Sequence, residues 1–147
     1  MKLVDIYLSY KKKYREYVVL IKSGIFYEVI EDDVGIMYSI FNYKIREIGN
    51  SYNIGFPINN IGFVCNKLED SKINYIILEK ENDNYQITTK KDYKNNNYSK
   101  YKIDLIRYSY INKRINRICD RLKNKIFDKD IENILLKMEG LIWTINY

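Results

Sequence analysis

Apolar and polar side chains alternate with two different periods along the first part of the chain. Apolar residues spaced three or four apart predict a helix over residues 3–14, and the lysines at 11–13 suit its C-terminus. Two β-branched and aromatic runs, 17–22 and 25–30, predict strands, and Ser23-Gly24 between them predicts a turn. The chain is therefore expected to begin with a helix and a β-hairpin.

The same two patterns alternate through the middle of the chain. Carboxylates at 31–33 complement a helix N-terminus, so a helix is expected from there to about Phe41, and Pro57 suits the first position of a helix over 57–70. Short strands are expected over 43–48, 52–56, 73–78 and 85–89. This order over residues 1–90 predicts an α+β fold with a mixed β-sheet flanked by helices.

The last third of the chain reads differently. Residues 91–97 are polar and rich in Asn, which predicts a linker or loop. Apolar residues then recur three or four apart from Tyr108 to Ile126 and again from Ile131 to Ile145. Two amphipathic helices joined by a short loop predict a helical hairpin within residues 98–147. Its apolar faces are expected to pack on the sheet domain or on a second copy, which would give a homo-oligomer.

Missing residue types and motifs exclude several classes of enzyme. The chain has no His, which removes Ser-His-Asp and Cys-His catalysis, and it has no phosphate-binding glycine motif. Cys65 and Cys119 cannot form a zinc site by themselves and are expected in the core. Asp70-Ser71-Lys72 has a spacing found in metal-dependent nucleases, but it falls at a helix end. We expect no cofactor, no metal ion and no enzymatic activity.

The lengths of the apolar runs and the residues near the N-terminus predict the cellular compartment of the protein. The apolar stretches are far shorter than the roughly 20 residues that cross a bilayer, and Asp5 interrupts any signal peptide. A cytoplasmic protein without membrane contact is therefore expected.

The placement of charge is more informative than its total. Ile, Lys, Asn and Tyr supply over half of the 147 residues, so the net charge of +6 and the 16 tyrosines carry little meaning alone. Residues 90–125, however, carry twelve cations and three carboxylates, a net +9, against −3 in the rest of the chain.

Several of these cations form a stripe along the first C-terminal helix. They step by three or four residues beside its apolar positions and suit nucleic-acid phosphates: Arg114, Arg117, Arg121 and Lys125, with Arg107 two turns before. A solvated helix face, or a surface for an acidic protein partner or its RNA, remains an alternative.

The segment Ser23 to Ile30 resembles the N-terminal mismatch-recognition domain, domain I, of the MutS family of DNA mismatch repair proteins. That domain has a helix, an apolar strand and then G-D-F-Y-E, which is similar to Gly24 through Phe26-Tyr27-Glu28. The family's G-I-P-Y-H-A turn looks like residues 55–60, and its later strand resembles Ile73 to Leu78. The sequence departs from the family pattern at Ile25, Asn59 and Lys80.

The resemblance implies roles for two residues. In the family, the Phe wedges into the minor groove beside the mispaired base and the Glu hydrogen-bonds that base, which here would be Phe26 and Glu28. Strand alternation places these two on one face, with Ile25, Tyr27 and Val29 toward the core. We add Lys22 to the same predicted site. The alternative is that Phe26 packs on a helix and Glu28 is solvated.

The family's connector, lever, clamp and ATPase domains have no counterpart in residues 98–147. The resemblance therefore implies a stand-alone MutS-like protein: a non-catalytic, nucleic-acid-binding accessory protein that senses mispaired or distorted duplex, either DNA or an RNA–DNA hybrid. The alternative is a protein–protein adaptor that keeps the fold without mismatch recognition. One example is an accessory subunit of a reverse transcriptase in a diversity-generating retroelement.

Overall fold

The computed structural model describes residues 2–145 and divides into two compact units. The sheet unit comprises residues 1–105 and the helical unit residues 106–147. The sheet unit holds the following elements in chain order: α1 (Leu3–Lys11), β1 (Val18–Ser23), β2 (Phe26–Ile30), α2 (Asp33–Phe41), β3 (Arg46–Ile48), β4 (Ser51–Pro57), η1 (Ile58–Asn60), α3 (Ile61–Asp70), β5 (Tyr75–Glu81), β6 (Asn84–Lys91) and η2 (Tyr98–Tyr101).

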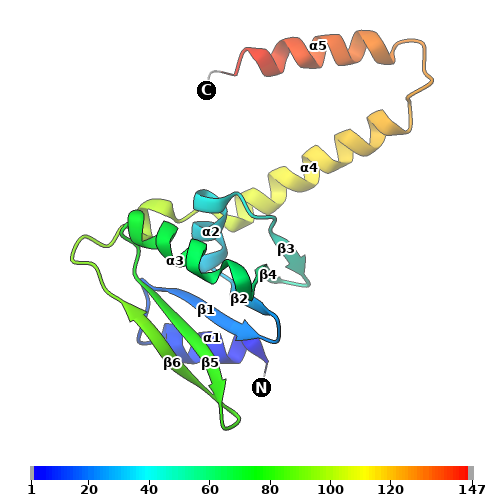
Figure 1. Cartoon of the computed structure of the whole chain (residues 1–147). Coiled ribbons are helices and arrows are strands. Elements are labelled where there is room, and N and C mark those ends of the chain that lie inside the picture. Colours follow the sequence, from blue (N-terminus) through cyan, green and yellow to red (C-terminus); the bar gives the residue numbers. More distant parts are fainter. Residues whose placement is uncertain (1, 146–147) are drawn as a thin grey trace. The chain divides into compact units, whose positions relative to one another are not determined.

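One mixed six-stranded sheet organises this unit (Figure 1). Its strand order is β3-β4-β2-β1-β5-β6. β1 and β5 pair in parallel, and the other neighbouring strands pair antiparallel. The α+β class with a mixed sheet and flanking helices, predicted from the sequence, is confirmed.

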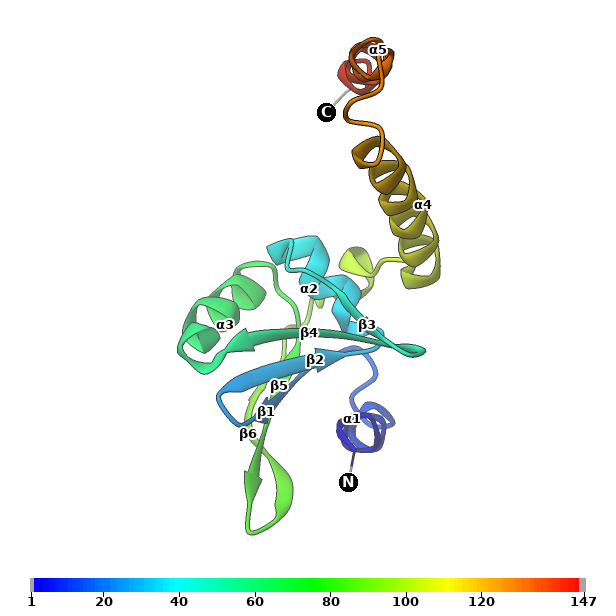
Figure 2. The ribbon, with the colours of Figure 1, turned by 90° about the vertical axis from the view of Figure 1, so that its right-hand side faces the viewer.

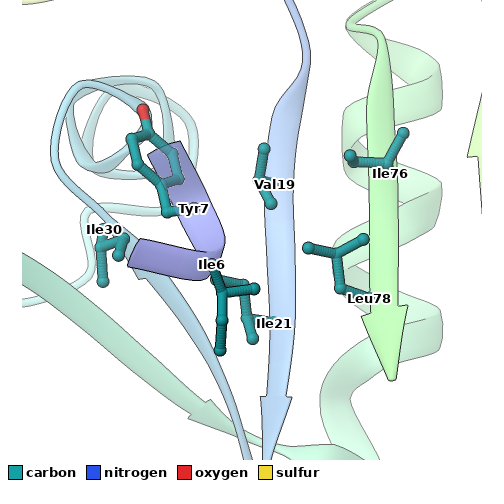
Figure 3. Packing of buried hydrophobic residues seen from close by; sticks show 7 residues of the cluster. All are labelled: Ile6, Tyr7, Val19, Ile21, Ile30, Ile76 and Leu78. Atoms are coloured by element: carbon teal, nitrogen blue, oxygen red, sulfur yellow. The ribbon is translucent and has the colours of Figure 1, made fainter. Parts of the chain in front are cut away.

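Helices cover both faces of the sheet, with α1 on one face and α2 and α3 on the other (Figure 2). Alternate residues of the central strands point toward α1 and form a closed apolar cluster with it (Figure 3): Ile6, Tyr7, Val19, Ile21, Ile30, Ile76 and Leu78. β1 is buried on both faces, which explains its continuous apolar sequence. The cluster stops at Ile30, and Glu28 and Phe26 lie further along the same face of β2.

A buried carboxylate joins four elements of the sheet unit. Asp33 is fully buried, and its Oδ1 accepts hydrogen bonds from Lys11 Nζ and the Tyr98 hydroxyl, each at 2.6 Å. Its Oδ2 accepts the backbone N–H of Val19 at 3.0 Å. Burial raises the pKa of Asp33 and lowers the pKa of Lys11, because each charge has lost water. The sequence suggested only helix-end roles for these residues.

Pro57 does not begin a helix, so this part of the prediction is wrong. It is the last residue of β4, opposite Phe26 of β2, and η1 separates it from α3, which begins at Ile61. A proline at a strand end is tolerated because its missing N–H leaves no interior ladder bond unmade. The first helix is also shorter than expected and ends at Lys11.

The Asn-rich segment is a folded part of the sheet unit. Lys90 and Lys91 extend β6, and the amide of Asn96 donates to the Glu16 carbonyl at 2.8 Å. Asn97 likewise donates to the carbonyl of Ser71 at 2.9 Å. These side-chain bonds replace regular secondary structure, so composition alone suggested a linker. The compact unit therefore extends past residue 90, to Leu105.

Because position 35 is a glycine, the segment around Ile103 can pass close to the backbone of α2. A Cβ on Gly35 would lie 2.7 Å from Cγ1 of Ile103, which is closer than carbon atoms approach. The segment after η2 therefore packs directly on the backbone of α2.

The helical unit contains the C-terminal helices that the sequence predicted. α4 spans Leu105–Lys123, beginning in the last residue of the sheet unit, and α5 spans Ile131–Trp143. Several large apolar side chains on both are at least 39% exposed, among them Ile111, Ile115, Ile118, Ile134, Leu135 and Ile142, whereas Ile131 at the start of α5 is buried. Neither helix combines the length and the apolarity needed to cross a membrane, and the same holds for the other helices of the described chain.

Candidate nucleic-acid interface

The β1–β2 hairpin presents two apolar side chains at its tip. Gly24 has a φ of +61°, a conformation that glycine adopts without strain, and it closes the two-residue turn. Ile25 beside it is 70% exposed, so the expectation that this side chain points to the core is wrong. Phe26 is 40% exposed, whereas Tyr27 and Val29 are buried as expected. An aromatic ring is thus accessible where the resemblance places a wedge.

Glu28 lies on the same face as Phe26 but is not simply solvated. Its side chain is only 15% exposed, and its Oε2 accepts a hydrogen bond from Arg46 Nη2 at 3.0 Å. The same oxygen accepts a hydrogen bond from Asn53 Nδ2 at 2.6 Å. Arg46 Nη2 also donates to Oδ1 of Asn53, which closes a triangle of three polar side chains.

The sequence pattern by itself does not single out Arg46 or Asn53. Two features of the sequence could have drawn attention to them: both residues belong to predicted strands, and Arg46 is one of two arginines outside residues 90–125. Their pairing with β2 depends on the order β3-β4-β2, which periodicity does not supply.

Lys22 does not join this group. It pairs with Tyr27 across the hairpin and therefore faces the side opposite Phe26 and Glu28. Its Nζ lies 3.2 Å from Glu79 Oε1, and that oxygen also accepts a hydrogen bond from the Tyr27 hydroxyl at 2.7 Å. These contacts, the Tyr27 bond most of all, lower the pKa of Glu79. Lys22 is thus part of an ion pair on the other face.

The predicted cations of the helical unit are exposed along and just beyond α4. Arg107, Arg114, Arg117 and Arg121 lie on the helix, and Lys125 follows its end. The guanidinium of Arg114 lies 5.6 Å from the ring centroid of Tyr110, and Lys125 Nζ is 3.7 Å from Asp128 Oδ2. Within the described residues, no group of three or more Cys, Asp or Glu side chains could hold a metal ion.

The fold and the hairpin together define an α+β domain with an exposed aromatic residue followed two positions later by an acidic one. The family model of MutS domain I matches residues 2–91, and the chain therefore belongs to the MutS domain I family. In the MutS family this domain is a mismatch-recognition, DNA-binding domain rather than a catalytic one. No curated protein matches the chain.

Proposed function

We propose that this protein is a non-catalytic nucleic-acid-binding accessory protein that senses mispaired or distorted duplexes through Phe26 and Glu28. The observation that carries the proposal is the exposed ring of Phe26 at the hairpin tip, on the same face as Glu28, in a MutS domain I. The duplex is DNA or an RNA–DNA hybrid.

An aromatic wedge residue replaces the stacking between two neighbouring bases with stacking of a base on its own ring. An apolar side chain that enters a base step unstacks it at a cost of about a few kcal/mol, and the kinked duplex then contacts more protein surface. A mispaired step is already weakened, so the cost is lower there. Phosphates repel a nearby carboxylate, and this cost is offset only where the carboxylate accepts a hydrogen bond from a base N–H, so Glu28 would contribute discrimination rather than affinity.

Phosphate contacts would come from the cations of the helical unit. These cations are exposed and regularly spaced on and just beyond α4, which suits contacts with nucleic-acid phosphates whatever the base sequence: Arg107, Arg114, Arg117, Arg121 and Lys125. Lys22 belongs to this proposal only as a peripheral cation, because it faces away from Phe26.

The test is equilibrium binding of the full chain to matched and mismatched DNA duplexes and to RNA–DNA hybrids, at several salt concentrations. Phe26→Ala should reduce the preference for mismatched duplex about tenfold, because one base–aromatic stack is lost. Phe63→Ala is the matched control, since Phe63 is 55% exposed on α3, which lies on the other face of the sheet. Binding of every duplex by Phe26→Ala as by wild type would contradict the proposal.

The exposed apolar rows of α4 and α5 favour a second candidate function, a protein–protein adaptor. In that case the helices dock on a second copy or on a polymerase, such as a reverse transcriptase of a diversity-generating retroelement. Light scattering of the purified chain detects the first arrangement. Binding to a reverse transcriptase encoded beside its gene tests the second. A monomer that binds duplex but no such polymerase excludes the adaptor.

A further inference from the structure

We infer that Arg46 is a positioning residue for Glu28. Position 55 must be glycine for this role, because the guanidinium of Arg46 occupies the space that a side chain at position 55 would fill. The inference rests on the proposed function, since it concerns how Glu28 is prepared to meet a base. It assigns a role in recognition to three residues of β3 and β4: Arg46, Asn53 and Gly55.

Strand register brings the group together. Arg46 of β3 is paired with Asn53 of β4, and Gly55 of β4 is paired with Glu28 of β2. The guanidinium of Arg46 reaches over β4 to the Glu28 carboxylate, and the absent side chain of Gly55 leaves the space it occupies. A Cβ on Gly55 would lie 2.5 Å from Arg46 Nη2 and 3.0 and 3.1 Å from the two carboxylate oxygens. The close approach therefore depends on glycine.

The arrangement leaves one carboxylate oxygen for a ligand. In the described part of the chain, Arg46 and Asn53 both bind Oε2 of Glu28, so Oε1 can accept an N–H from a base edge. The guanidinium neutralises the carboxylate, which lowers its repulsion of a phosphate backbone, and holds it in one orientation. Preorganised charge costs no rearrangement when the ligand arrives.

The contribution of the Arg46–Glu28 ion pair to folding stability does not explain why these side chains are arranged in this way. The Arg46 side chain is 50% exposed, and ion pairs open to water contribute little to folding stability. The triangle also lies beyond the apolar cluster under α1, on the same face of β2 as Phe26.

The decisive variant is Gly55→Ala, because it displaces the arginine without changing any charge. Arg46 is flexible and half exposed, so the chain can fold around the new methyl group by moving the guanidinium away. Arg46→Met removes the same contact with no added atom, and Arg46→Lys restores the charge without the planar fork. Gly62→Ala is the control for the glycine change, since no atom lies within 4 Å of a Cβ there. Lys67→Met is the control for loss of an exposed cation, since Lys67 lies on α3, on the other face of the sheet.

Binding of each full-length variant to matched and mismatched duplexes gives the result. We expect Gly55→Ala and Arg46→Met to lower the mismatch preference about five- to tenfold, with the salt slope unchanged in Gly55→Ala because its net charge is unchanged. Arg46→Lys should be intermediate, and both controls should keep the preference. In a Glu28→Gln background, Arg46→Met should cause no further fall in the preference.

Two outcomes would overturn the inference alone: an unchanged preference in Gly55→Ala, or an equal loss for all duplexes in Arg46→Met and Lys67→Met. The absence of any preference in wild type would instead refute the proposed function, and the inference would fall with it. Wild-type binding thus separates the two failures.

Discussion

At the scale of single residues, the Lys11–Asp33 ion pair is held away from most of the solvent and therefore needs compensating contacts. Removing both charges from water is costly, and the geometry compensates with two further hydrogen bonds to Asp33, from Tyr98 and Val19. Such a pair contributes less to stability than its short distance suggests. Loss of Asp33, however, leaves the Lys11 charge without its counterion at a site where only 14% of the Lys11 side chain is exposed.

Asp33→Asn should therefore destabilise the protein by about 3 to 5 kcal/mol, because the Lys11 ammonium would remain buried without its counterion. Urea unfolding followed by circular dichroism measures this. Asp32→Asn is the matched control, since Asp32 is exposed and its Lys102 partner lies 3.3 Å away. It should cost less than about 1 kcal/mol. Equal effects of the two substitutions would show that the burial is unimportant.

At the scale of secondary-structure elements, α4 carries two surfaces side by side. Its apolar positions are exposed at intervals of three and four residues, and Arg114 and Arg117 lie beside them. The apolar row matters to the adaptor candidate and the arginines matter to the nucleic-acid proposal. Substitutions on one row can therefore leave the other intact.

Charge reversal of Arg114 and Arg117 to Glu should weaken duplex binding at least tenfold and reduce the salt slope by about two, because two phosphate contacts are lost. The matched control reverses Lys12 and Lys13, which follow α1 and give the same change in net charge. Binding titrations across salt compare the pairs. Equal losses in both pairs would indicate a response to net charge rather than a site on α4.

Much of the fold could be predicted from the sequence because local signals agree with it. The apolar run of β1, the Ser23-Gly24 turn and the heptad-like spacing of α4 each depend on near neighbours in the chain. Pro57 was misplaced because proline also suits a strand end. The contacts of the Asn-rich segment, predicted as a linker or loop, could not be foreseen because its side chains bond to carbonyls far away in sequence.

The candidate site was predictable only in part, for a related reason. Motif and alternation were enough to pair Phe26 with Glu28 and to place them on one face. They could not show that Glu28 already holds Arg46, nor that Lys22 faces away, because both facts follow from register between strands. Ile25 broke the alternation because it belongs to the turn rather than to the strand.

At the scale of the whole molecule, the family match and the folded unit end at different residues. MutS domain I matches to residue 91, but the compact sheet unit continues to Leu105. The additional residues supply the Tyr98 hydroxyl to Asp33 and cover Gly35 with Ile103. They therefore complete the interior of the unit.

A chain of residues 1–105 should consequently unfold cooperatively, whereas one of residues 1–91 should be less stable by at least about 2 kcal/mol. The shorter chain loses the buried Tyr98 ring and its two hydrogen bonds with charged groups, one donated to Asp33 and one accepted from Lys11. Thermal and urea unfolding of the two fragments give the comparison. Equal stabilities would show that residues 92–105 only rest on the surface.

The parallel pairing of β1 with β5 also governs the order of events during synthesis. Val18 meets Tyr75, which lies 57 positions later in the chain. At ribosomal rates of about 5–20 residues per second, β1 waits roughly 3 to 11 seconds for its partner strand. Until then one edge of the most apolar strand is open and Ile6 and Tyr7 have only part of their partners. This interval is the time in which the nascent chain is most prone to aggregate and most in need of a chaperone.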